Sequence, residues 1–137
     1  MTDTLNVDYL VIGAGASGMA FVDILLSESD ATVAIVDKLD KPGGHWNDAY
    51  SFVTLHQPSS FYGVSSKELS KGVIDKTGLN AGFHELASGS EILAYYDDLM
   101  RETFIPSRRV SVRKKSEEPR GGRGRGARRG PVRQKQA

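Results

Sequence analysis

Hydrophobic positions at the start of the chain form three runs that predict a strand, a helix and a second strand. Residues 7–12 are a short apolar run of the kind that becomes a buried strand. Residues 16–27 are mostly apolar, with Asp23 on a narrow polar strip, as in a helix packed on a sheet. Residues 32–36 form a second strand-like run that ends in Asp37. This order predicts a βαβ unit, and hence an α/β fold with a parallel sheet.

A second helix is predicted over residues 88–103. Ser88 and Glu91 have the spacing of a capping box, in which Ser88 is the N-cap and Glu91 reaches back to the main chain. Pro106 ends the helix. One face of the helix is apolar and needs a partner, for which we expect the βαβ unit; its residues are Ile92, Tyr96, Leu99, Met100 and Thr103.

The connecting segments are rich in turn-forming residues. Pro42-Gly43-Gly44 predicts a turn shortly after the second strand. Trp46, two residues later, either anchors this turn to the core or offers a flat apolar face to a ligand. Residues 65–87 contain many Gly, Ser, Asn and Lys residues, and predict an irregular connection with a helical turn near 66–70.

Three glycines follow the first strand with the spacing G-x-G-x-x-G. Gly13 permits a sharp turn, Gly15 permits close approach of the backbone to a ligand, and Gly18 permits tight packing of helix on strand. Free N–H groups near Ala16 and Ser17, at the positive end of the helix dipole, would bind a pyrophosphate. A glycine turn without a dinucleotide is the alternative, but the carboxylate at the end of the second strand favours binding, because such an acid holds the ribose.

Composition excludes several classes of protein. The 137-residue chain has the length of one domain with one core. It contains no cysteine, which excludes disulfides, thiol nucleophiles and Cys-type metal sites. No two of its three histidines are four residues apart on a helix, so we expect no metal site. The N-terminal region shows neither a signal peptide nor a membrane span, and we expect a cytoplasmic protein.

Charge divides the chain at about residue 107. Residues 1–107 carry 6 Lys/Arg and 15 Asp/Glu, whereas residues 108–137 carry 12 and 2, and the formal net charge of +1 hides this division. The later residues are rich in Arg and Gly and have no apolar period. We therefore expect a domain at 1–107 and a disordered Arg/Gly-rich tail at 108–137.

Two interpretations of this tail are open. In the first, it binds nucleic acid through the phosphates, although no Phe, Tyr or Trp lies among the arginines to stack on bases. In the second, it is the product of a reading-frame shift, because the pattern breaks where further strands are needed to complete a doubly wound sheet. We favour the second, so nucleic acid is not an expected partner.

The order of the motifs resembles that of a known protein family. The motifs are the glycine turn at 13–18, Asp37, the segment Gly43-Gly44-His45-Trp46 and the run at 55–63. This order resembles the N-terminal FAD-binding part of flavin-containing monooxygenases and of the related Baeyer–Villiger-type flavoproteins. The resemblance covers residues 5–107. It implies a partial Rossmann-like, FAD/NAD(P)-binding fold that is truncated or frame-shifted after about residue 107.

The resemblance implies a role for each motif. Asp37 would accept hydrogen bonds from the adenosine ribose, and because the family more often has Glu here, NAD stays open as the nucleotide. His56 would reach toward the flavin edge. The pyrophosphate of FAD would be held by Gly13, Gly15, Ala16, Ser17 and Gly18. Gln57 would reach the same flavin edge as His56, His45 and Trp46 would lie along the flavin side of the cofactor, and Gly44 would let the backbone approach it.

The resemblance also implies an activity. Intact members use NADPH to reduce FAD, and the reduced flavin then activates O₂ to oxygenate a small organic substrate. This chain shows no second glycine fingerprint for NADPH, so we expect an FAD-binding segment that is catalytically incomplete. The alternative is a small module for NAD or FAD, completed by a partner chain that supplies the rest of the sheet.

Overall fold

The computed structural model of the chain describes residues 4–115, and a parallel sheet lies at its centre. The sheet has three strands in the order β1-β2-β5, namely β1 (Tyr9–Ile12), β2 (Val33–Asp37) and β5 (Val110–Lys114). Helix α1 (Ala16–Glu28) forms the crossover from β1 to β2. The structure thus confirms the predicted βαβ unit and the α/β fold.

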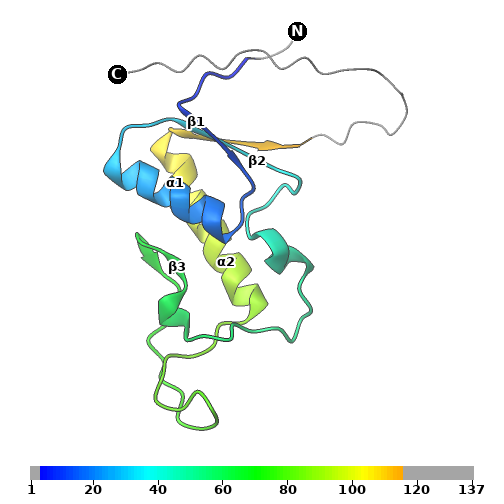
Figure 1. Cartoon of the computed structure of the whole chain (residues 1–137), viewed down its shortest axis with the longest axis vertical. Helices are drawn as coiled ribbons and strands as arrows, with labels where there is room; N and C mark the ends of the chain where they lie inside the picture. The colour runs from blue at the N-terminus through cyan, green and yellow to red at the C-terminus, as the bar shows by residue number, and fades with distance from the viewer. Residues whose placement is uncertain (1–3, 116–137) are drawn as a thin grey trace, which may run out of the picture.

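The two long helices lie on the same side of the sheet. Figure 1 shows α1 and α2 (Gly89–Leu99) below the sheet, with the short elements of the middle of the chain further down. Val11 of β1 is buried on this side, together with Val33 and Ile35 of β2. These strand residues form one core with the buried side chains of both helices. Burial of this apolar surface is the main contribution to stability.

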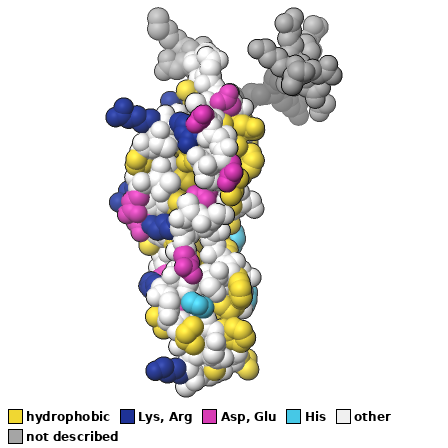
Figure 2. Space-filling view, turned by 90° about the vertical axis from the view of Figure 1, so that its left-hand side faces the viewer, with side chains coloured by type: hydrophobic (Ala, Val, Ile, Leu, Met, Phe, Trp, Pro, Cys, Tyr) yellow, Lys and Arg dark blue, Asp and Glu magenta, His cyan; other side chains and the backbone are white. Residues whose placement is uncertain are grey.

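Hydrophobic side chains also reach the surface. In the view of Figure 2 they lie in the upper half of the molecule, at the level of the sheet and α1, and again at its lower end. The most exposed among residues 4–115 are Leu79, Phe52, Ile12, Tyr50, Phe61 and Leu10. Single exposed apolar residues are ordinary, whereas neighbouring ones indicate a contact surface.

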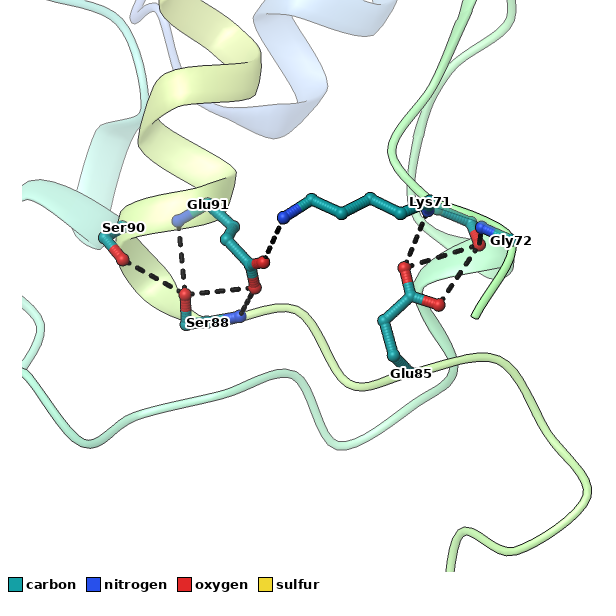
Figure 3. Close-up of polar contacts among 7 residues, drawn as sticks. Lys71, Gly72, Glu85, Ser88, Ser90 and Glu91 are labelled. Atoms are coloured by element: carbon teal, nitrogen blue, oxygen red, sulfur yellow. Dashed lines mark hydrogen bonds and ion pairs between the residues drawn. The ribbon is translucent and has the colours of Figure 1, made fainter. Parts of the chain in front are cut away.

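Helix α2 begins at the predicted cap. The Ser88 hydroxyl accepts a hydrogen bond from the Glu91 N–H, and the Glu91 carboxylate accepts one from the Ser88 N–H at 2.8 Å (Figure 3). Past Leu99 the helix widens into a π-helical turn, η3 (Met100–Phe104), and then tightens into a 3₁₀ turn, η4 (Ile105–Ser107). The buried face includes Tyr95 and Phe104, which the sequence pattern missed, and leaves Thr103 only partly buried.

Residues 44–68 form short elements. They are the 3₁₀ helices η1 (Gly44–Asp48) and η2 (Ser59–Phe61) and the strands β3 (Gly63–Val64) and β4 (Lys67–Glu68), which pair antiparallel. The predicted helical turn at 66–70 is therefore wrong. The reason is long-range: the Tyr95 hydroxyl accepts a hydrogen bond from the Val64 N–H at 2.8 Å and donates one to the Lys67 carbonyl.

The same hairpin is tied to α1 through Asp23. Its carboxylate accepts hydrogen bonds from the Ser66 N–H, at 3.1 Å, and from the Ser66 hydroxyl, and only 2% of the residue is exposed. The polar strip predicted on α1 is therefore an internal contact. Because a buried carboxylate is costly without partners, these bonds explain how Asp23 is accommodated.

Strand β5 lies in the segment predicted to belong to the tail. Val110 is buried beside Val33, and Val112 is in register with Ile35. Arg109 donates hydrogen bonds to the carbonyls at the end of α1, including that of Leu26 at 2.7 Å. The predicted boundary at 107 is thus corrected, because residues 110–114 belong to the sheet. They form a strand by pairing with β2, although their own sequence shows no apolar period. The rest of the predicted tail, 116–137, lies outside the described residues.

Candidate functional site

The three fingerprint glycines form a tight turn between β1 and α1. Gly13 has φ of +99°, in the region that favours glycine, and its N–H donates to the Val36 carbonyl at 2.8 Å. A Cβ on Gly18 would lie 2.2 Å from the Gly13 carbonyl oxygen. Gly18 therefore lets α1 pack directly on the turn, as the sequence predicts.

The N-terminus of α1 carries main-chain donors that no side chain occupies. Gly15 is the N-cap, it makes no side-chain cap bond, and the first turn contains no acidic residue. The first helical bond is donated by the Met19 N–H to the Gly15 carbonyl at 2.9 Å. The N–H groups of Ala16, Ser17 and Gly18 precede it and are the orphan donors of the helix. Together with the positive end of the helix dipole they can bind an anion.

Asp37 faces this turn. One carboxylate oxygen accepts a hydrogen bond from the Ala14 N–H at 2.6 Å, and the other accepts one from the Leu39 N–H at 2.8 Å. The residue is partly buried and adjoins the carboxyl ends of β1 and β2. Ligands of parallel α/β sheets bind outside the carboxyl ends of the strands, so the acid is placed where a nucleotide would lie.

The Gly43-Gly44 loop lies against the fingerprint turn. The Gly43 N–H donates to the Ala14 carbonyl at 2.9 Å, and a Cβ on Gly44 would lie 2.9 Å from the Cα of Gly15. Both glycines have positive φ. The two glycine segments, which the sequence suggested would approach one ligand, are therefore in direct contact.

Trp46 anchors this loop to the core. Only 8% of the residue is exposed, and its indole N–H donates to the Tyr62 hydroxyl at 3.0 Å. The Tyr62 ring packs edge-on against Trp46 and also against Tyr96. Burial raises the pKa of the Tyr96 hydroxyl, which stays neutral in the physiological range. The anchoring interpretation of Trp46 holds, although the side chain also contacts a cavity.

This cavity has a volume of about 430 Å³ and begins at the N-terminus of α1. Its wall is mainly apolar, which suits a planar aromatic ligand more than a free phosphate. The His45 ring lies 5.1 Å from that of Trp46 on the wall. The lining residues are Ala16, His45, Trp46, Ala49, Val53, Thr54, Leu55, His56, Gln57 and Tyr62.

The structure brings the predicted site residues together in two adjoining groups. Ala16, His45, Trp46 and Gln57 line the cavity. The other six, Gly13, Gly15, Ser17, Gly18, Asp37 and Gly44, lie at or against the turn beside it. The sequence missed Tyr62 as a wall residue, and no local signal marks it, because its contacts with Trp46 and Tyr96 join three separate segments.

The described residues show neither a metal site nor a membrane-spanning helix. The described part of the chain contains no group of three His, Asp or Glu side chains arranged to hold a metal ion. Among residues 4–115, no helix combines the length and apolar character required to cross a membrane.

Comparison with known proteins places the chain among dinucleotide-binding domains. Residues 11–99 match the family described as the NAD(P)-binding Rossmann-like domain. An uncharacterised protein of Mycobacterium tuberculosis is 52% identical over 107 residues, which are 78% of this chain and 20% of that protein. A ferredoxin–NADP reductase of Thermus thermophilus is 26% identical over 98 residues, 72% of this chain and 29% of the reductase.

Solved structures with the same arrangement include flavin monooxygenases. A flavin-containing monooxygenase from Stenotrophomonas maltophilia has a TM-score of 0.55 at 24% identity, covering 76% of this chain and 27% of that one. A cyclohexanone monooxygenase variant from Rhodococcus sp. Phi1, bound to NADP⁺, has a TM-score of 0.51 at 29% identity, covering 77% and 19%. The resemblance expected from the sequence is confirmed. The chain spans about a fifth of the length of the mycobacterial relative.

Proposed function

Because the chain belongs to the NAD(P)-binding Rossmann-like domain family, we propose that residues 4–115 bind FAD as the cofactor-binding part of an NAD(P)H-dependent flavoprotein oxidoreductase of the monooxygenase type. One observation carries this proposal. The uncapped N-terminus of α1 opens beside a mainly apolar cavity of about 430 Å³ that Trp46 lines. A pyrophosphate site next to an aromatic-lined cavity fits a flavin dinucleotide.

Each group of residues has its own part of the cofactor to hold. The pyrophosphate is held by the N–H groups of Ala16, Ser17 and Gly18 at the start of α1. Gly13 and Gly15 shape the turn so that the pyrophosphate can approach these groups, and the Gly13 N–H itself donates to the Val36 carbonyl. Asp37 accepts hydrogen bonds from the adenosine ribose. Gly44, which has no Cβ, lets its loop lie close to Gly15 and to the cofactor bound there. His45, Trp46 and Gln57 contact the flavin side from the cavity wall.

When bound, FAD would supply the redox chemistry: reduced by a nicotinamide, it would pass its electrons to O₂, so that one oxygen atom enters a small organic substrate and the other leaves as water. The residues of this chain contribute binding and orientation. The helix N-terminus neutralises part of the pyrophosphate charge, and the apolar wall keeps water from the ring end of the cofactor. In the described residues the glycine fingerprint occurs once, at Gly13–Gly18, and it is assigned to FAD.

Trp46 provides a test, because it is the one tryptophan of the chain and lies in the cavity wall. Titration with FAD, corrected for inner-filter absorption, is expected to quench its fluorescence saturably. ADP, which lacks the flavin, is expected to compete with FAD without quenching. Saturable quenching by NADH together with no response to FAD would overturn the assignment and favour NAD as the nucleotide.

A further inference from the structure

The side chains of Trp46 and Tyr62 are joined by a hydrogen bond in the wall of the cavity beside α1. The indole N–H of Trp46 donates to the Tyr62 hydroxyl at 3.0 Å, and the ring centroids lie 6.4 Å apart at an interplanar angle of 85°. Both residues line the cavity of about 430 Å³. Tryptophan and tyrosine are among the side chains that give up one electron most readily. An oxidant formed in this cavity therefore meets two oxidisable rings in direct contact.

The two rings differ in what oxidation leaves behind. Loss of one electron turns the indole of Trp46, which is only 8% exposed, into a radical cation. A buried charge without a partner is costly, and the phenol oxygen that the indole N–H meets is a poor base for its proton. Tyr62 is less buried, and a phenol that loses an electron together with its proton becomes a neutral radical. Transfer of an electron from Tyr62 to Trp46 is therefore favoured, because it removes the buried charge.

The hydrogen bond already has the arrangement that the product of this transfer needs. Its donor is the indole N–H and its acceptor is the phenol oxygen, so the same N–H can donate to the oxygen of a phenoxyl radical. The Tyr62 ring is held from its other side by Tyr96, which is 1% exposed and lies 6.3 Å away between centroids. Neither ring has to move for the electron to pass.

Tyr62 also lines a second cavity. This cavity has a volume of about 420 Å³, its wall is mainly polar, and the other lining residues come from 60–65 and from Glu68. A radical on Tyr62 is therefore within reach of a small polar reductant in this second cavity.

We propose that Trp46 and Tyr62 form a redox pair that protects the wall of the cofactor cavity from oxidation. A one-electron oxidant in the cavity takes an electron from the Trp46 indole. Tyr62 replaces this electron, its O–H bond breaks and the proton passes to solvent, so the indole is restored and one phenoxyl radical remains. The role rests on the proposed FAD site for its oxidant, a partly reduced oxygen species formed from O₂ at the flavin. The transfer itself needs only the two rings.

Pulse radiolysis of the full chain without FAD tests the transfer. Azide radicals oxidise the one tryptophan of the chain, whose radical absorbs at a different wavelength from a tyrosyl radical. We expect the tryptophanyl signal to decay as the tyrosyl signal grows, at a first-order rate that is independent of protein concentration. Tyr62→Phe, which keeps the ring and removes the hydroxyl, is expected to lower this rate at least about tenfold.

The matched control is Tyr50→Phe. Tyr50 is close to Trp46 in sequence, but it is 74% exposed and its ring stacks on Phe52. This variant should keep the wild-type rate. Circular dichroism shows that each variant remains folded.

The position of the final radical is tested on the wild-type chain, with no substitution. A nitroso spin trap is added during continuous irradiation, and mass mapping of peptides is expected to find its adduct on Tyr62. A tryptophanyl radical that decays only by second-order recombination, a wild-type rate in folded Tyr62→Phe, or adducts that are absent from Tyr62 would overturn the proposal. FAD binding without this transfer would overturn the redox pair alone, whereas transfer in a chain that does not bind FAD would overturn the proposed function alone.

Discussion

The carboxylate of Asp37 accepts a hydrogen bond from the Ala14 N–H at 2.6 Å, which ties the end of β2 to the turn that follows β1. A second bond, from the Leu39 N–H at 2.8 Å, fixes the other oxygen. The acid proposed to meet the ribose is therefore positioned by the protein before any ligand arrives. Such preorganisation lowers the entropic cost of binding.

This relationship predicts the effect of Asp37→Asn. The Asn side chain keeps one acceptor oxygen of Asp37 and replaces the other with an NH₂ donor. One of the two main-chain N–H groups that Asp37 binds therefore loses its partner. The free energy of unfolding is expected to fall by about 1–3 kcal/mol in urea denaturation. Asp40→Asn, at an exposed position nearby, is the control and should change it by less than about 0.5 kcal/mol. Equal stabilities for both variants would contradict the structural role of Asp37.

Two glycine substitutions should separate folding from binding. In Gly18→Ala the new Cβ lies 2.2 Å from a main-chain oxygen, and we expect a loss of about 1–3 kcal/mol in stability. In Gly15→Ala the new Cβ meets nothing closer than 3.7 Å, so the fold is retained with a loss below about 1 kcal/mol.

For Gly15→Ala we expect the affinity for FAD to fall although the fold is retained. The added methyl group keeps the pyrophosphate from the helix N-terminus, and we expect the dissociation constant to rise at least about tenfold. Fluorescence titration of both folded variants measures this. Wild-type affinity in Gly15→Ala would contradict the assigned position of the pyrophosphate.

The hydrogen bonds of Arg109 predict that the folded part of the chain extends past residue 107. The Arg109 guanidinium donates to the carbonyls of Leu26 and Ser29 at the end of α1, where a cation also complements the helix dipole. Arg109→Ala is expected to lower the free energy of unfolding by about 1–2 kcal/mol. Arg113→Ala, at an exposed position on β5, should have little effect. If both variants match the wild type, Arg109 does not cap α1.

The lowered pKa of Glu91 predicts that the stability of the fold depends on pH. The hydrogen bond from Lys71 and that from the Ser88 N–H lower the pKa of Glu91 below its ordinary 4.5 (Figure 3). A carboxyl whose pKa is lower in the folded chain stabilises the fold above the unfolded-state pKa, and this contribution is lost as the pH falls through the folded-state pKa. Glu91→Gln should therefore be less stable than wild type at pH 7, and the difference should shrink below pH 4.5.

The control for this titration is Glu28→Gln, at an exposed position at the end of α1. Its stability difference from wild type should be small and should not follow the same pH course. A gap between Glu91→Gln and wild type that is constant from pH 3 to pH 7 would show that hydrogen bonding in the cap, and not the charge of Glu91, carries the effect.

Features set by neighbouring residues could be predicted from the sequence. The βαβ unit follows from the spacing of apolar residues, the turn follows from Gly13, Gly15 and Gly18, and the start of α2 follows from the Ser88–Glu91 spacing. Each of these depends on contacts within a few residues or on one periodic pattern.

Features set by distant residues could not be predicted in this way. Strand β5 depends on the pairing of Val110 with Val33, and the β3–β4 hairpin depends on Tyr95, far along the chain. Within the candidate site, the predicted residues lie at the turn or along the cavity beside it, but the wall of that cavity depends on the contact between Trp46 and Tyr62. Such contacts leave no local pattern, which is why the sequence gives no shape for the cavity.

We propose that the FAD pyrophosphate lies on the bare main-chain amides at the start of α1. Amide chemical shifts of ¹⁵N-labelled chain, recorded during titration with FAD, test it most directly. We expect the N–H signals of Ala16, Ser17 and Gly18 to shift saturably, together with the indole signal of Trp46. Shifts confined to other residues, with these three amides unchanged at saturating FAD, would contradict this position of the pyrophosphate.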